Sequence, residues 1–126
     1  MDSKNQIQKR ELKFRAYSNV SEKMMDWNFI KAVGNLTKLI CLDHISLMQF
    51  TGREDAEING KEVYEGDIIE NCDTKDLQIV YWNDNQSAWF CKYVFDKLRI
   101  VSLTDSLGNL NKVIGNIYEN PDLLKV

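Results

Sequence analysis

An acid-rich stretch in the middle of the chain, NGKEVYEGDIIEN, comes nearest in residue type and spacing to a site for chemistry. Together with the acids before it, this stretch matches the first half of a calcium-binding loop, at Asp55, Glu57, Asn59 and Gly60. The last position of such a loop needs a glutamate that binds through both carboxylate oxygens, and this chain has Gly66 there. The flanking residues also favour strands, whereas an EF-hand needs helices. We therefore expect no calcium site here.

The same residues are typical of a structural corner. Asn59-Gly60 is a pair that favours the positive backbone dihedral angles of a tight turn. Gly66 allows the chain to change direction, and the Asp67 carboxylate can accept hydrogen bonds from nearby backbone N–H groups. The apolar pair Ile68-Ile69 then enters the core. The sequence predicts that Asn59, Gly60, Gly66 and Asp67 shape the backbone.

Carboxylates for acid–base catalysis are available in Glu62, Glu65 and Asp67. Exposed acids with ordinary titration are far commoner than catalytic ones. The single histidine, His44, cannot form a histidine cluster for a metal, and the chain has no G-x-S-x-G elbow and no phosphate-binding glycine loop. We expect no cofactor and no metal, and we keep a small acid-dependent enzyme as a minor alternative.

Aromatic and basic residues raise the question of a binding surface. Trp82 and Trp89 lie in an aromatic-rich segment, and aromatic side chains on paired strands can stack nucleobases, although they more often pack in a core. Binding to nucleic acid also needs a basic groove, which the strip KRELKFR near the N-terminus could supply. The candidate interaction surface consists of Lys9, Arg10, Lys13, Arg15, Trp82 and Trp89.

The elements that would position these residues are mostly strands. ELKFRAYS (residues 11–18) alternates apolar and polar side chains with period two, which predicts a half-buried strand. MMDWNFI (24–30) can return beside it as the second strand of an N-terminal hairpin. HISLMQFTG (44–52) predicts a strand that ends at a Thr51-Gly52 turn. Apolar runs on both sides of NDNQS, within residues 77–95, predict a second hairpin.

Helical signals are weak. Residues 31–42 are ambiguous because Gly34 interrupts any helix, and DSLGNLN (105–111) is expected to be a loop. NPDLL near the C-terminus predicts a last helical turn, with Asn120 as its cap and Pro121 at the first helical position. The predicted fold is therefore mostly β: antiparallel strands form a small SH3-like barrel or sheet, with an N-terminal hairpin and short helical turns. We expect one domain over residues 1–126, with residues 1–9 as a flexible lead-in.

The cysteines and the lengths of the apolar runs indicate the cellular compartment. The three cysteines are odd in number and widely spaced, with no C-x-x-C pair, which indicates reduced thiols in a cytoplasm. The first residues show no apolar core of a signal peptide, and no apolar run reaches the ~20 residues of a membrane helix. We expect a cytoplasmic protein that does not bind membranes.

Charge and aromatic content both favour association. Residues 1–31 have a positive balance, whereas residues 54–76 carry nine acids and two lysines. One face of a two-stranded hairpin can place only about half of its side chains in a core, so some aromatic residues of segment 77–95 would be exposed. These features predict a homo-oligomer, most simply a dimer, unless the C-terminal turn covers the patch.

Three segments in this order resemble the YopX family of phage and prophage proteins: KRELKFRAYSNVSEKM, LMQFTGREDAEINGKEVYEGDII and VIGNIYENPDLL. Two departures lie in the second segment, where REDAEI is longer than the family pattern and Arg53 replaces a common leucine. The resemblance implies a phage or mobile-element origin in a bacterial host and a mostly β fold that contains a small barrel. It supplies no catalytic residues.

These observations favour a non-enzymatic accessory protein that binds another macromolecule, more readily a protein than a nucleic acid. A nucleic-acid-binding regulator that uses the basic N-terminal strip is the alternative.

Overall fold

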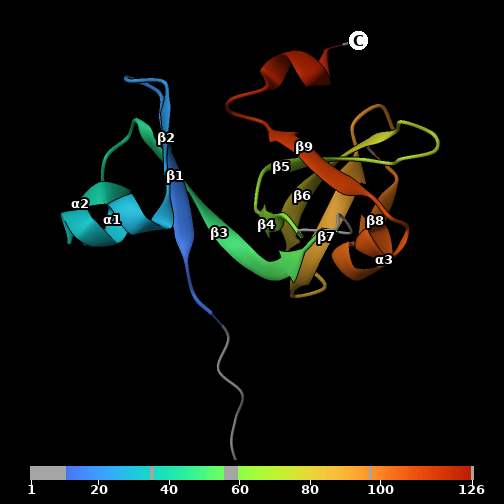
Figure 1. Cartoon of the computed structure of the whole chain (residues 1–126), viewed down its shortest axis with the longest axis horizontal. Coiled ribbons are helices and arrows are strands. Elements are labelled where there is room, and N and C mark those ends of the chain that lie inside the picture. Colours follow the sequence, from blue (N-terminus) through green and yellow to red (C-terminus); the bar gives the residue numbers. More distant parts are fainter. Residues whose placement is uncertain (1–10, 35, 56–59, 97, 126) are drawn as a thin grey trace, which may run out of the picture.

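The computed structural model describes residues 11–34, 36–55, 60–96 and 98–125. Two antiparallel sheets lie side by side, and one of them curls into a half-barrel (Figure 1). The predicted mostly β architecture with few short helices is confirmed. Lys9, Arg10 and Asn59 lie outside the described residues.

The first sheet has the strand order β2-β1-β3-β4. Its strands are β1 (Phe14–Ser18), β2 (Lys23–Met25), β3 (Ile45–Glu54) and β4 (Glu62–Tyr64). The predicted N-terminal hairpin is present, since β1 pairs with β2 through Ala16 opposite Met25. Its second strand is shorter than expected, because helix α1 (Trp27–Val33) begins within the residues predicted to be strand.

The second sheet has the order β8-β7-β6-β5-β9. Its strands are β5 (Asp67–Glu70), β6 (Leu77–Asn83), β7 (Ala88–Tyr93), β8 (Ile100–Ser102) and β9 (Lys112–Asn116). The hairpin predicted around NDNQS is the β6–β7 pair, with Trp82 directly opposite Trp89.

Short helices form in two segments for which the sequence predicts a strand or a loop. The α1 helix has Asp26 as N-cap, whose carboxylate accepts from the Phe29 N–H, and it ends at Gly34, which has φ +76°. Helix α2 (Leu36–Ile40) follows. The loop prediction for DSLGNLN is wrong, because helix α3 (Leu103–Gly108) begins there on a Ser102 cap.

The core lies between β4, the second sheet and α3. Its buried cluster consists of Val63, Ile69, Val80, Cys91, Leu103, Leu107 and Val113. Helix α3 exists because Leu103 and Leu107, four positions apart, share one face and complete this core. Burial in the core thus stabilises a helix that is too short to show a clear helical period of apolar residues in its sequence.

The long strand β3 joins the two halves of the molecule (Figure 1). The turn predicted at Thr51-Gly52 is wrong, because β3 continues to Glu54. Gly52 has φ +87°, and the pairing with β4 shifts register between Phe50 and Glu54. The glycine therefore produces an irregularity inside a strand rather than the end of one.

A 3-10 turn at Pro121–Leu124 ends the described chain, with Pro121 in the first turn as expected. Asn120 precedes it but makes no side-chain capping hydrogen bond to it. Among the described residues, no helix has both the length and the apolar character needed to span a membrane.

Candidate functional site

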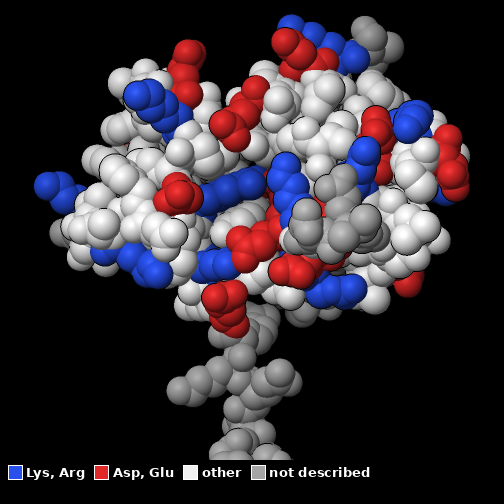
Figure 2. Space-filling model, in the orientation of Figure 1, with Lys and Arg blue, Asp and Glu red and all other residues white. Residues whose placement is uncertain are grey.

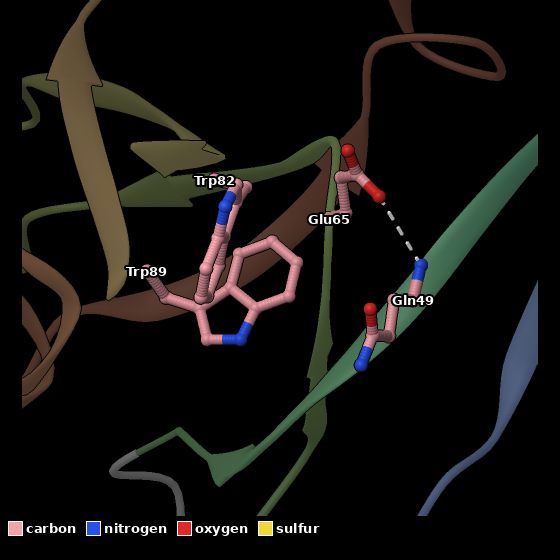
Figure 3. A pocket seen from close by; sticks show the side chains of 4 residues that line it. All are labelled: Gln49, Glu65, Trp82 and Trp89. Atoms are coloured by element: carbon pink, nitrogen blue, oxygen red, sulfur yellow. Dashed lines mark hydrogen bonds between the residues drawn. The ribbon is translucent and has the colours of Figure 1, made fainter. Parts of the chain in front are cut away.

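An aromatic cleft opens beside the β6–β7 hairpin. Directly opposite residues of an antiparallel pair project from the same face, so the pairing of Trp82 with Trp89 brings their indoles together. The ring centroids lie 5.2 Å apart with planes at 75°, an edge-to-face arrangement. Gln49 from β3 and Glu65, between β4 and β5, complete the lining of a cavity of about 370 Å³ (Figure 3). We refer to these four residues as the aromatic cleft.

Hydrogen bonds hold the polar side of the aromatic cleft in place. The Gln49 N–H donates to Glu65 Oε1 over 3.3 Å, and the Glu65 N–H donates to the Gln49 carbonyl oxygen over 2.9 Å. The Glu65 carboxylate is therefore tethered to the neighbouring strand, and it lies with Gln49 across the cavity from the indoles (Figure 3). The cleft thus presents a fixed anionic group beside aromatic surface.

The two tryptophans differ in how they are held. Trp89 is half-buried and packs against the core cluster, whereas 41% of Trp82 is exposed. A rigid indole with its base in the core and a second, exposed indole beside it offer contact area at a small entropic cost. Trp82 is the more exposed of the two indoles.

The two described cations of the basic N-terminal strip are neutralised within the molecule. Lys13 forms an ion pair with Glu62 and lies 4.6 Å from the Phe50 ring centroid. The hydrogen bond to Glu62 raises the pKa of Lys13, which stays charged. The positively charged region, residues 1–31, and the acidic segment 54–76 are therefore paired with each other at this ion pair.

Arg15 is held in the same way at the junction of the two sheets. Its guanidinium donates to Asp67 Oδ1 over 2.5 Å and lies 4.7 Å from the Tyr64 ring centroid. The Tyr64 N–H donates to the other Asp67 oxygen over 2.7 Å. Burial raises the pKa of the Asp67 carboxyl, while Arg15 and the Tyr64 N–H oppose that rise. Asp67 is therefore a buried structural anion whose charge depends on Arg15.

Two of the corner residues, Gly66 and Asp67, lie at this junction. Gly66 has φ +85°, its N–H donates to the Val80 carbonyl oxygen, and its own carbonyl oxygen accepts from the Ile117 N–H. Gly60 has φ +52° at the end of the acidic loop. Within the described chain, Gly66 and Asp67 thus contact β1, β4, β6 and the segment after β9.

Asp55, the first residue of the calcium-loop pattern, has another role. Its Oδ1 accepts from the Lys61 N–H over 2.9 Å, and its Oδ2 accepts from the Val113 N–H over 3.0 Å. The buried carboxylate therefore closes the acidic loop and anchors it to β9. Both oxygens carry backbone hydrogen bonds, and Glu57 lies outside the described residues.

The four described residues of the candidate interaction surface thus separate into two places. Trp82 and Trp89 meet in the aromatic cleft, whereas Lys13 and Arg15 are held by ion pairs and do not line it. Gln49 was not singled out from the sequence, and Glu65 was singled out only as one acid among several. No local signal marks either as a partner of the hairpin, because the pairing of Gln49 with Glu65 is set by the β3–β4 register.

A family model matches residues 13–125, which is nearly the whole described chain. The chain belongs to the YopX family. The resemblance seen in the three sequence segments is confirmed. These segments contribute Arg15, the Gly66-Asp67 step and the turn after β9, and they meet at the junction described above.

One solved structure of similar fold is the crystal structure of protein EF1440 from Enterococcus faecalis. The two chains are 21% identical, with a TM-score of 0.61, and the match covers 93% of this chain and 100% of the other. At this identity the likeness shows the fold. No curated protein matches the chain.

Proposed function

We propose that this YopX-family protein is a non-enzymatic accessory protein of a phage or prophage that acts in the bacterial cytoplasm by binding another protein through the aromatic cleft. The observation that carries the proposal is the cleft itself, where an exposed tryptophan, a core-anchored tryptophan and two polar side chains line one cavity. Tryptophan is enriched among the residues that dominate the energy of protein interfaces.

The composition of the cleft favours binding over catalysis. Glu65 is the one titratable side chain among the described residues that line the cleft, whereas acid–base catalysis commonly uses two groups with different proton affinities. The other acids considered from the sequence, Glu62 and Asp67, form ion pairs with Lys13 and Arg15. These carboxylates have a structural role that accounts for them.

The charge distribution favours a protein partner over a nucleic acid. Nucleic-acid binding requires cations that can neutralise phosphates, and Lys13 and Arg15 already neutralise carboxylates of this chain. On the face drawn in Figure 2, the Lys and Arg side chains are interspersed with Asp and Glu. Glu65 would also repel a phosphate that approached the indoles. A regulator that binds nucleic acid with the N-terminal strip remains the alternative.

A comparison of variants tests the proposal. Wild type, Trp82→Ala and Phe95→Ala are immobilised and exposed to extract from infected host cells, and proteins retained on each are identified by mass spectrometry. Phe95 is the matched control, because it is an aromatic residue, 59% exposed, that does not line the cleft. Each candidate partner is then purified and its affinity measured by calorimetry.

We expect a partner that wild type and Phe95→Ala bind equally and that Trp82→Ala binds at least ~10-fold more weakly, as for an interface residue worth more than 1 kcal/mol. A partner bound equally by all three proteins would place binding elsewhere on the molecule. Retention of DNA or RNA with no protein partner would favour the alternative.

A further inference from the structure

Two cations of this chain share a common arrangement with their neighbours. The Arg15 guanidinium lies over the Tyr64 ring and forms an ion pair with Asp67. The Lys13 ammonium lies over the Phe50 ring and forms an ion pair with Glu62. In each case one cation is held between an aromatic face and a carboxylate, which combines cation–π attraction with a charge-assisted hydrogen bond.

The aromatic cleft contains the same two components without the cation. Trp82 and Trp89 supply the aromatic surface, and Glu65 supplies the carboxylate. Within the described residues Glu65 forms no ion pair, and no Lys or Arg lies over either indole. Tryptophan is the aromatic side chain that attracts cations most strongly.

We infer that the aromatic cleft receives an arginine side chain of the partner protein, an inference that rests on the proposed function. The guanidinium would stack against an indole and donate hydrogen bonds to the Glu65 carboxylate. Arginine fits better than lysine, because its planar group stacks on aromatic rings and carries five donors in a fixed geometry. Those donors can also reach the Gln49 amide oxygen, a second acceptor in the lining.

Other ligands of aromatic sites fit the cleft less well. A nucleotide would bring phosphates toward Glu65, which is unfavourable for like charges. A neutral sugar packs against a flat aromatic face, whereas these two indole planes meet at 75° and form a corner. The cavity of about 370 Å³ falls within the range of ~300–1,000 Å³ typical of small-ligand sites, so it has room for a whole side chain.

Tryptophan fluorescence provides a direct test. The chain has three tryptophans, and in a Trp27→Phe background the cleft holds the remaining two. The probes are a blocked glycine peptide with one central arginine, the same peptide with citrulline (a neutral group of nearly the same shape), adenosine monophosphate and N-acetylglucosamine. The variants are Glu65→Gln, which keeps the shape of the cleft, and Asp122→Asn, which removes an exposed carboxylate outside it.

We expect the arginine peptide to change the fluorescence saturably with a Kd of about 1 mM, and the citrulline peptide to bind at least ~10-fold more weakly. Glu65→Gln should weaken arginine binding by at least ~10-fold, whereas Asp122→Asn should leave it unchanged. Trp82→Phe, which keeps an aromatic ring, should retain part of the affinity, and each variant is first shown to melt like the background protein.

Equal binding of the citrulline and arginine peptides, or binding of the nucleotide or sugar that Glu65→Gln does not change, would overturn the inference. So would the absence of any arginine response. The proposed function is judged separately from captured partners: one that needs Trp82 but not Glu65 would leave that function standing while the arginine inference fails. A partner whose affinity is unchanged by Trp82→Ala would contradict the proposed function itself.

Discussion

Asp67 is the residue whose surroundings do most to connect the parts of this fold. Its two oxygens accept from Arg15 and from the Tyr64 N–H, and its side chain is 1% exposed. A buried carboxylate without a partner is strongly destabilising, and this one depends on a single guanidinium from β1. The ion pair is therefore a contact between distant segments whose loss should be measurable.

Replacing Arg15 with methionine should lower the free energy of unfolding by ~3 kcal/mol at neutral pH, because the Asp67 charge would stay buried and unpaired. Loss of Arg15 also removes an influence that lowers the Asp67 pKa, so the variant binds a proton more readily when folded. The deficit should therefore shrink as the pH falls from 7 toward the ordinary Asp value of 3.8.

Urea denaturation across this pH range measures the effect. Lys125→Met is the control, because its ion pair with Asp122 is exposed and should contribute at most ~1 kcal/mol. A deficit for Arg15→Met as small as that of the control would mean that the buried pair does not stabilise the junction.

Cys91 differs from the other two cysteines in its chemistry. It is fully buried in the core cluster, and burial raises the pKa of its thiol to about 12, whereas Cys41 and Cys72 are exposed. Because the thiolate is the reactive form, we expect two fast-reacting thiols in the native protein with a disulfide reagent at pH 8, and three after unfolding in guanidinium. Three equally fast thiols in the native state would contradict the packing of this core.

At the scale of elements, two glycines occupy positions at which a larger residue would disturb the connections between strands. Gly66, between β4 and β5, has φ +85°. A β-branched side chain is strained there, so Gly66→Val should lower the melting temperature, with a cost of ~1 kcal/mol or more. Gly108→Ala is the matched control, because its backbone has no positive φ and an added Cβ would meet no atom within 4 Å. A melting temperature unchanged by Gly66→Val, with binding lost, would indicate a functional role instead.

Gly115 in β9 acts through close approach rather than through φ. An added Cβ would lie 2.7 Å from the Asn120 Cγ, and Asn120 Oδ1 accepts from the Asn116 N–H. Gly115→Ala should displace Asn120 and leave a part-buried N–H without its acceptor, which lowers stability by ~1–3 kcal/mol. Thermal melting beside Gly108→Ala measures the difference, and equal melting of the two variants would show that the turn adapts.

At the scale of the whole molecule, the remaining exposed apolar surface bears on self-association. Leu98 and Ile100 are exposed at or beside β8, an edge strand of the second sheet. Exposed apolar edges favour pairing with another strand, so we predict a homodimer. Light scattering at tens of micromolar protein should detect it, and Ile100→Lys should weaken it while Val20→Lys, in the β1–β2 turn, does not. A monomer at both low and high salt would end this prediction.

The sequence could predict the local parts of this fold. The N-terminal hairpin and the NDNQS hairpin follow from period-two patterns with turn residues between them, which are interactions among near neighbours. The short helices α1 and α3 were missed, because seven and six residues show too little period, although the caps Asp26 and Ser102 were readable signals. At Gly52 the sequence predicts the end of a strand that in fact continues. In a sequence, a glycine that bends a strand cannot be told from a glycine that ends one.

The sequence alone determined the mostly β class, the main hairpins and the resemblance to the family, because each depends on residues that are contiguous in the chain. Only the tertiary structure decided which charges are neutralised and which residues share a cleft. Lys13 meets Glu62, Arg15 meets Asp67, and Gln49 lines the same cavity as Trp89, all across tens of residues. Such contacts depend on strand register and sheet curvature, which are set by packing of the whole core and leave no local pattern.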